Sequence, residues 1–257
     1  MPTNPANPPQ RLPYIEAARG NISDYIAADK FGYSPAVGTT AEDIWDAGGT
    51  YSGFLTAAST VRVKSGGDAN DTVAGTGARK VIVSGLDENW AIAQEEIDLA
   101  GASQSSATTT QFIRVNRVYV SAAGTYGGTN AGNIDIEDTA GSNLLARISA
   151  GFSQSLMFIL TIPAGHEGHL QHIDIFEDSS KTTTIRLWQR QNADVTTGDM
   201  GAARIVRYIA GSTQGELRLT GDGLPTFPEK TDIWIDAAVS AGTEGVSVVG
   251  TGYFTTV

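Results

Sequence analysis

The chain has 257 residues, of which 40% are hydrophobic and 18% charged, and its formal net charge at pH 7 is −11. This composition is typical of a globular protein with one large or two small domains, and it excludes disordered and fibrous chains. A negative surface repels phosphate backbones, so we expect no nucleic-acid partner. The sequence contains no cysteine, which excludes disulfides and sulfur-based metal sites.

Membrane and export signals are missing from the sequence pattern. No apolar run approaches the roughly 18 residues that cross a bilayer. The first thirteen residues, MPTNPANPPQRLP, lack the apolar segment of a signal peptide. We therefore expect no membrane partner, and synthesis in a cytoplasm.

The N-terminal region is rich in proline. The sequence holds nine prolines, and six of them fall in the first 35 residues: Pro2, Pro5, Pro8, Pro9, Pro13 and Pro35. Proline fixes φ and lacks an N–H donor, so we predict an extended arm over residues 1–50, of polyproline type to about residue 13. Residues 14–30 are also compatible with one or two short helical turns.

The predicted arm carries isolated apolar and aromatic residues, which are the usual anchors in protein interfaces. Their spacing suits grooves on a partner better than a core of their own. Removal of residues 1–35 is therefore expected to leave the melting temperature nearly unchanged and to abolish attachment to the partner. The predicted anchors are Leu12, Tyr14, Ile15, Tyr25, Ile26, Phe31, Tyr33 and Trp45.

From about residue 50, short β-branched and aromatic runs alternate with glycine, asparagine and aspartate, which predicts strands and turns. Helical periodicity is nearly absent, so a parallel sheet with helical crossovers is disfavoured. We predict an all-β fold in which residues 51–257 form an antiparallel jelly-roll-like β-sandwich. The predicted strands are 54–64, 78–85, 91–99, 111–121, 132–137, 143–149, 155–162, 168–176, 183–191, 203–210, 215–220, 231–239 and 246–255. The side chains predicted to be buried on two of them are Ile185, Leu187, Ile233 and Ile235.

Residues 66–80 (GGDANDTVAGTGARK) raise the question of a calcium or phosphate loop. An EF-hand needs a glutamate at its twelfth place, where this sequence has Arg79. A phosphate loop needs Gly-Lys-Ser/Thr at the start of a helix, and this segment leads into the strand pattern KVIVSG instead. The segment is therefore interpreted as a long glycine-rich connection between strands.

Three histidines, His166, His169 and His172, suggest a metal site. In a regular strand His169 lies on the face opposite His166 and His172, which are themselves about 20 Å apart. We therefore expect no metal bound by one chain. Whether the three histidines meet across subunits stays open.

The sequence gives little support for catalytic residues. Residues 151–155 (GFSQS) lack the second glycine of a nucleophile elbow. The adjacent acids at 87–88 and 95–96 point to opposite faces of a strand, so neither pair converges on a substrate. We expect no catalytic site, no enzyme activity and no cofactor. The four tryptophans favour core or interface roles over a sugar-binding platform: Trp45, Trp90, Trp188 and Trp234.

Four stretches of the sequence carry a resemblance to a known group of proteins. They are residues 30–35 (KFGYSP), 39–51 (TTAEDIWDAGGTY), 71–79 (DTVAGTGAR) and 112–117 (FIRVNR). Together they resemble virion structural proteins of tailed bacteriophages, particularly phages of marine and freshwater bacteria. The similarity runs from about residue 28 to residue 170 and transfers no catalytic residue.

The resemblance implies a capsid decoration (cement) protein, made in the host cytoplasm and located on the exterior of the phage head. Its implied partners are the major capsid protein and further copies of itself, as a homotrimer. A neck, tail or fibre component is the alternative within the virion. A carbohydrate-binding or depolymerising virion module is a third hypothesis, which tryptophans clustered beside convergent carboxylates would favour.

Overall fold

The computed structural model describes residues 16, 19–22, 24–178, 181–212, 216–220 and 224–257. Within these residues every named element is a β-strand, and every pairing between strands is antiparallel. The prediction of an all-β, antiparallel protein is confirmed. No helix in the described part of the chain is long and apolar enough to span a bilayer.

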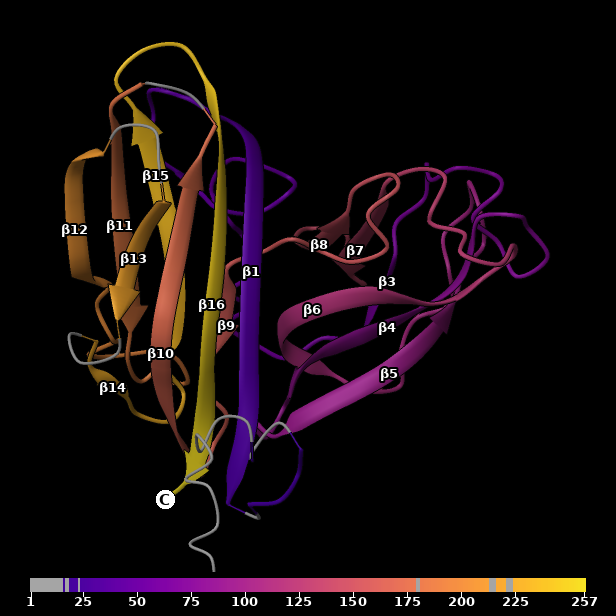
Figure 1. Ribbon diagram of the computed structural model, residues 1–257. Helices are drawn as coiled ribbons and strands as arrows, with labels where there is room; N and C mark the ends of the chain where they lie inside the picture. The colour runs from indigo at the N-terminus through magenta and orange to yellow at the C-terminus, as the bar shows by residue number, and fades with distance from the viewer. Residues whose placement is uncertain (1–15, 17–18, 23, 179–180, 213–215, 221–223) are drawn as a thin grey trace, which may run out of the picture.

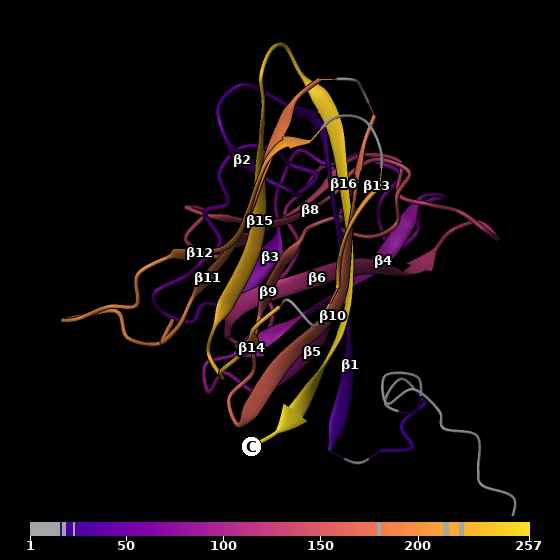
Figure 2. The same cartoon turned by 60° about the vertical axis from the view of Figure 1, so that its left-hand side comes forward.

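Two five-stranded sheets pack face to face as a sandwich, which Figures 1 and 2 show from two sides. The first sheet has the order β1 (Tyr25–Val37), β16 (Glu244–Thr256), β10 (His166–Glu177) and β13 (Glu216–Thr220), and β14 (Thr226–Phe227) also pairs with β10. The second sheet has the order β12 (Arg204–Ser212), β11 (Thr183–Arg190), β15 (Asp232–Val239) and β2 (Glu42–Asp43), and β9 (Ile159–Thr161) also pairs with β15.

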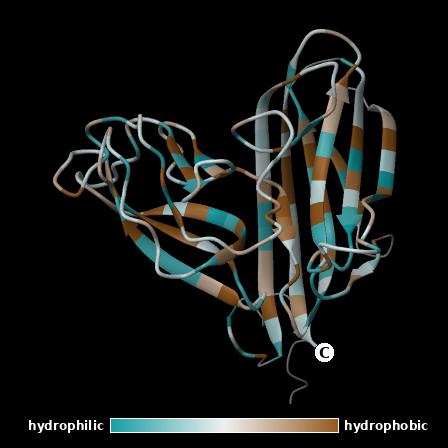
Figure 3. Ribbon diagram, turned by 180° about the vertical axis from the view of Figure 1, so that it is seen from behind, coloured by the Kyte–Doolittle hydropathy of each residue, from teal (hydrophilic) through white to brown (hydrophobic). Residues whose placement is uncertain are grey.

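The core of the sandwich follows from the alternation of apolar and polar residues along its strands. On β11 and β15 the residues predicted to be buried are at most 1% exposed, so that prediction is confirmed: Ile185, Leu187, Ile233 and Ile235. From the first sheet, Ile173 and Val248 meet them in the same cluster. Figure 3 shows the alternation as brown and teal bands along the strands. A strand with one buried face needs this period of two.

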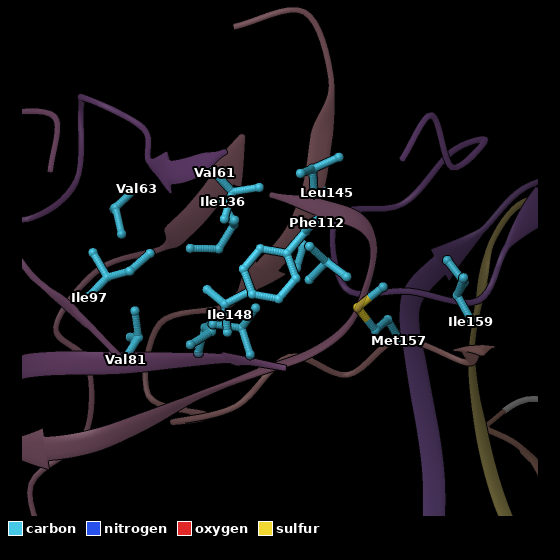
Figure 4. Packing of buried hydrophobic residues seen from close by; sticks show 14 of the residues in the cluster. Val61, Val63, Val81, Ile97, Phe112, Ile136, Leu145, Ile148, Met157 and Ile159 are labelled. Carbon is cyan, nitrogen blue, oxygen red and sulfur yellow. The ribbon is translucent and has the colours of Figure 1, made fainter. Parts of the chain in front are cut away.

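A second lobe, formed by residues 51–155, lies beside the sandwich (Figure 1). It contains two three-stranded sheets, β3 (Val61–Val63), β7 (Ile134–Asp138) and β8 (Leu144–Ile148), and β5 (Ile92–Asp98), β4 (Ala78–Asp87) and β6 (Phe112–Ala123). These sheets enclose a core of their own around Phe112, Ile136 and Leu145 (Figure 4). The structure thus differs from the expected single sandwich over residues 51–257, since only residues after about 156 return to it.

The second lobe is inserted into the middle of one strand of the sandwich. β2 and β9 occupy the same edge of β15 in continuous register, because Asp43 lies opposite Asp236 and Ile159 lies opposite Trp234. The Phe158 N–H donates to the Ile44 carbonyl at 2.9 Å and closes the gap between them. The two short strands therefore act as one strand, interrupted by more than a hundred residues.

The N-terminal region differs from the predicted arm from Tyr25 onward. β1 is an integral strand that pairs with β16 from Tyr25 opposite Thr255 to Val37 opposite Glu244. Its inward residues are buried, and Val37 is fully so. The physical reason is the alternation of buried and more exposed residues in the segment YIAADKFGYS (25–34), which contains no proline. Pro35 follows it, at a register shift between Ser34 and Val37. β1 also occupies residues 25–30, which belong to the segment 14–30 where short helical turns were considered.

One buried ion pair joins the two lobes. Arg114 of β6 donates from Nε and Nη2 to the two carboxylate oxygens of Asp232 on β15, at 2.8 and 3.0 Å. Arg114 is 2% exposed and Asp232 is fully buried. The Arg114 guanidinium also donates to the Leu55 carbonyl at 2.7 Å and lies 4.8 Å from the centre of the Trp90 ring. This contact fixes the second lobe against the outer side of the second sheet.

Candidate functional site

The outward side of the first sheet carries several of the predicted anchors. Because side chains alternate along β1, Tyr25, Phe31 and Tyr33 point away from the core, opposite to the buried Ala28. Phe31 lies directly across from Val249 of β16, which is 40% exposed. We call this side of β1, β16 and β10 the outer face.

An open apolar groove of about 500 Å³ crosses the outer face and reaches the second lobe. Phe152, which follows β8, contributes the far wall and is 49% exposed. Monomeric proteins seldom leave contiguous apolar side chains in water unless a partner covers them. The side chains that form the groove include Phe31, Tyr33, Phe152, Leu156 and Val249.

Aromatic rings extend the outer face toward the N-terminal end of β10. The Tyr25 and Tyr253 ring centres are 5.2 Å apart, and His169 stacks on Tyr253 at 4.9 Å. Burial, followed by the nearby Tyr25, raises the pKa of the Tyr253 hydroxyl above its ordinary value. The aromatic rings at this end add apolar surface to the outer face.

The other predicted anchors do not gather on the outer face. Trp45 is 3% exposed and packs edge-on against Tyr51 in the core of the second lobe, so its predicted role as a partner anchor is wrong for this structure. Its indole N–H donates to the Gly49 carbonyl at 3.1 Å. Ile26 lines a different cavity, beside β4. Leu12, Tyr14 and Ile15 lie outside the described residues.

The histidines are arranged differently from the prediction. A register shift in β10 between Leu170 and His172 places His169 and His172 on the same outer face, opposite Tyr253 and Thr251 of β16. A β-bulge inserts one residue and reverses the alternation beyond it, which the sequence pattern does not reveal. His166 points to the other face, toward Phe254. Within the described residues no group of three or more metal-ligating side chains could hold an ion.

The glycine-rich segment 66–80 is held together by one buried carboxylate. Asp71 is 3% exposed and accepts hydrogen bonds from the backbone N–H groups of Ala78, Ala131 and Gly132, at 2.8 to 2.9 Å. Its oxygens are thereby used within the chain. This arrangement agrees with a connection between strands and leaves the carboxylate no role in a calcium loop.

The candidate catalytic groups have structural partners. The Asp87 carboxylate closes a tight turn by accepting the Asn89 and Ala91 N–H groups at 2.8 and 3.0 Å. Glu95 accepts the Thr109 and Thr110 N–H groups, both at 2.8 Å. Ser153 has φ of 59° in a turn. All three histidines, which could act as bases, lie on β10 and contact other groups.

Two tryptophans gather on the outward side of the second sheet. Trp188 and Trp234 are cross-strand neighbours whose rings stack at 5.9 Å with an interplanar angle of 5°. The Arg186 guanidinium lies 5.2 Å from the Trp188 ring centre and makes two hydrogen bonds to Asp236, at 2.7 and 2.6 Å. With Asp43 they line a cavity of about 330 Å³. The sequence suggested scattered tryptophans, because register across strands is not visible in it.

The carboxyl of Asp46, where the chain leaves the sandwich for the second lobe, is a weaker acid than an ordinary aspartate. It is 9% exposed, and burial raises the pKa of its carboxyl to about 7, although Ser149 donates to it at 3.2 Å. The native state therefore binds this proton more tightly than the unfolded chain does. The stability that the protonated Asp46 carboxyl contributes is fully present below about pH 4 and is lost as the pH rises from about 4 to about 7.

An Asp46→Asn variant should remove this contribution, because asparagine is neutral at every pH. Relative to the unchanged protein, we expect the variant to gain on the order of 3 kcal/mol in unfolding free energy between pH 4 and pH 7. Urea unfolding at half-unit pH steps measures this difference. Burial also raises the pKa of Asp43, to about 6. Asp43 therefore adds a smaller decrease of the unfolding free energy with pH, which ends near pH 6 and is the same in both proteins. A difference between the two proteins that stays constant with pH would contradict the expectation.

Comparison with known proteins identifies no family. No family model matches the sequence, and no curated protein does. Among solved structures, the chain is similar to the VP2 subviral particle of infectious bursal disease virus, at 9% identity over 96% of this chain and 82% of that chain, with a TM-score of 0.19. A structure of the Gx strain of that virus gives 10% identity over 91% and 72%, with a TM-score of 0.21. Such low TM-scores establish neither a common fold nor a common function, and neither protein is from a tailed bacteriophage.

Proposed function

We propose that the chain is a non-enzymatic structural protein of a phage particle. In this proposal it is a capsid decoration protein that binds major capsid subunits on the head exterior as a homotrimer, after synthesis in the host cytoplasm. The observation that carries the proposal is the apolar groove of the outer face, where Phe152 and Val249 are exposed to solvent and Phe31 is partly exposed. The sequence resemblance to tailed-phage virion proteins supplies the identity of the partner.

The strand order supports a jelly roll as the finer description of the sandwich. If β2 and β9 count as one strand and the two-residue β14 is left out, the sandwich has eight main strands in chain order. The first sheet then has the order first, eighth, third and sixth, and the second sheet has fifth, fourth, seventh and second. Two four-stranded sheets interleaved in this way are the pattern of a jelly roll, an architecture common in viral capsid proteins.

The absence of enzyme activity is part of the proposal. The acids considered for catalysis hold turns or loops, as Asp87 and Glu95 do. General acid–base chemistry needs such groups within reach of a substrate proton, and these oxygens already accept backbone N–H groups. The arrangement thus favours a structural role.

The position in the particle separates a decoration protein from a neck, tail or fibre component. A decoration protein occurs in hundreds of copies for each head, whereas a tail part occurs in a few to a few tens. Quantitative mass spectrometry of purified particles of the phage that encodes the chain measures this number. A copy number in the low tens would move the proposal from head to neck or tail.

Carbohydrate binding is the second candidate, because Trp188 and Trp234 lie beside the carboxylates of Asp43 and Asp236. Each indole, however, already contacts the other, and Trp234 also meets Phe54 at 5.3 Å. Sugar rings need a free aromatic face, so the cluster fits an internal contact better. Quenching of tryptophan fluorescence by host-surface glycans, lost on Trp188→Ala, would favour this second candidate.

Attachment to the head should depend on the groove. A Phe31→Ser, Val249→Ser double variant is expected to bind heads stripped of the chain at least about tenfold more weakly, because interface energy concentrates in buried aromatic and apolar anchors. Co-sedimentation with the heads measures binding. The matched control is Tyr126→Ser, which alters a fully exposed aromatic residue of the second lobe and should leave binding unchanged. Equal binding by the double variant and the control would show that another surface attaches the protein.

A further inference from the structure

A separate cavity of about 310 Å³ lies between β1 and the second lobe, on the side of β1 that Figure 1 shows facing β4 and β6. Its walls come from six strands, β1, β4, β5, β6, β9 and β16, and combine apolar and cationic side chains. This volume is at the lower end of the range for small-ligand pockets, roughly 300 to 1,000 Å³. The lining residues that matter for binding are Ile26, Lys30, Ile92, Asn116, Arg117 and Phe254.

Lys30 is a buried cation without a carboxylate partner among the described residues. It is 6% exposed, and its ammonium donates to the Asn116 carbonyl, which uses one of its three donors. Burial, followed by repulsion from Arg117, lowers the pKa of Lys30 to about 7. Burial without a counter-charge favours the neutral amine, so an anion bound beside Lys30 would stabilise the ammonium form that the described residues leave unpaired.

Arg117 adds a second positive charge to the same cavity. Its Nη2 donates to Gln154 Oε1 at 2.7 Å, and its guanidinium lies 5.1 Å from the Phe31 ring centre. Its Nε is buried and makes no hydrogen bond within the described part of the chain. Asp29 also borders the cavity, but it is exposed and alternates to the opposite face of β1 from Lys30.

We propose that this cavity binds a small organic monocarboxylate. The carboxylate lies with Lys30 and Arg117, and the apolar body lies against Ile26, Ile92 and Phe254. A charge-assisted hydrogen bond to the Lys30 ammonium satisfies a donor that is otherwise unused, and the Arg117 guanidinium adds a second positive charge. The apolar walls disfavour inorganic phosphate, which needs polar contacts on every side. The net charge of −11 makes general attraction of anions an inadequate explanation, so binding depends on this site. The inference is independent of the proposed function.

Calorimetric titration of the full chain with hexanoate tests the ligand class. Hexanoate should bind at least about tenfold more tightly than hexanol, which lacks the charge, and than acetate, which lacks the apolar body. Failure of hexanoate to bind at millimolar concentration would overturn the proposal. Equal affinity for hexanol would overturn it too, because the two cations would then contribute nothing.

Variants test the assigned residues. Lys30→Met should weaken hexanoate binding at least about tenfold, with an unchanged or higher melting temperature, since removal of a buried unpaired charge relieves its desolvation. Arg117→Gln should also weaken hexanoate binding. If Lys30→Met does not fold, the Arg117→Gln variant alone tests whether the ligand lies in this cavity. The matched control is Lys64→Met, which removes the charge of an exposed lysine outside the cavity and should bind hexanoate normally. Unchanged affinity in the Lys30 and Arg117 variants would place the ligand elsewhere and overturn the assignment.

Discussion

Replacement of Asp232 with asparagine is expected to lower the free energy of unfolding by about 3 to 5 kcal/mol, the usual cost of leaving a buried charge without its partner. Asp232 is fully buried and accepts hydrogen bonds from Arg114 of the second lobe, from Thr161 at 2.6 Å and from Arg190 at 3.1 Å. Asparagine keeps the shape but removes the charge. The Arg114 guanidinium, 2% exposed, then stays in the interior without a counter-charge.

Chemical denaturation of the variant and of the unchanged protein measures this loss. The matched control is Asp194→Asn, which breaks the ion pair of Lys230 and Asp194, at 2.8 Å, where both side chains are about one third exposed. Exposed pairs contribute about 1 kcal/mol or less, so the control should lose little. Similar losses in the two variants would mean that Asp232 does not compensate a buried charge, and that other contacts hold the lobes together.

The strands themselves could be predicted from the sequence because one face of each is buried. The predicted strand at 183–191 corresponds to β11 (Thr183–Arg190), and that at 231–239 corresponds to β15 (Asp232–Val239). Alternation of apolar and polar residues is a local property, fixed by the pleat of the strand. Local patterns therefore identified these two strands and their buried side chains.

The arrangement of the strands could not be predicted in the same way. The pairing of β1 with β16 joins residues near the two ends of the chain, and the strand made of β2 and β9 is interrupted by the whole second lobe. Neither relation leaves a local signal, because both depend on which apolar faces meet. The proline-rich start suggested an arm, but the prolines end before β1 apart from Pro35.

The candidate sites show the same limit. Tyr25, Phe31 and Tyr33 were predicted to be anchors, yet their place on an outward sheet face follows from the pairing of β1. The cavity with Lys30 and Arg117 was missed, because these residues are far apart in the sequence and meet only when the second lobe packs against β1. The available signal was a lysine within an alternating strand segment, on the same face as Ala28 and Gly32.

Deletion of residues 1–35 is expected to prevent folding of the sandwich, which reverses the expectation from the sequence alone. The deletion removes nearly all of β1, so β16 loses its hydrogen-bonding partner from Tyr25 to Ser34. The buried side of β1 also disappears, and with it the cover that Ala28 and Ser34 provide. Exposed backbone N–H and C=O groups of β16 then form an unprotected edge, which promotes aggregation.

Far-ultraviolet circular dichroism and size-exclusion chromatography measure this outcome, and a peptide of residues 24–38 added in trans provides the control. Because an extended peptide can complete a sheet with an exposed edge, the peptide should restore the β signal and the monomeric elution of the truncated chain. A peptide with Lys30→Pro should fail, since proline has no N–H for the pairing with Gly250 and cannot complete the ladder. If the truncated chain instead melts like the full protein without any peptide, β1 is dispensable, and residues 1–35 behave as the separate arm that their prolines suggested.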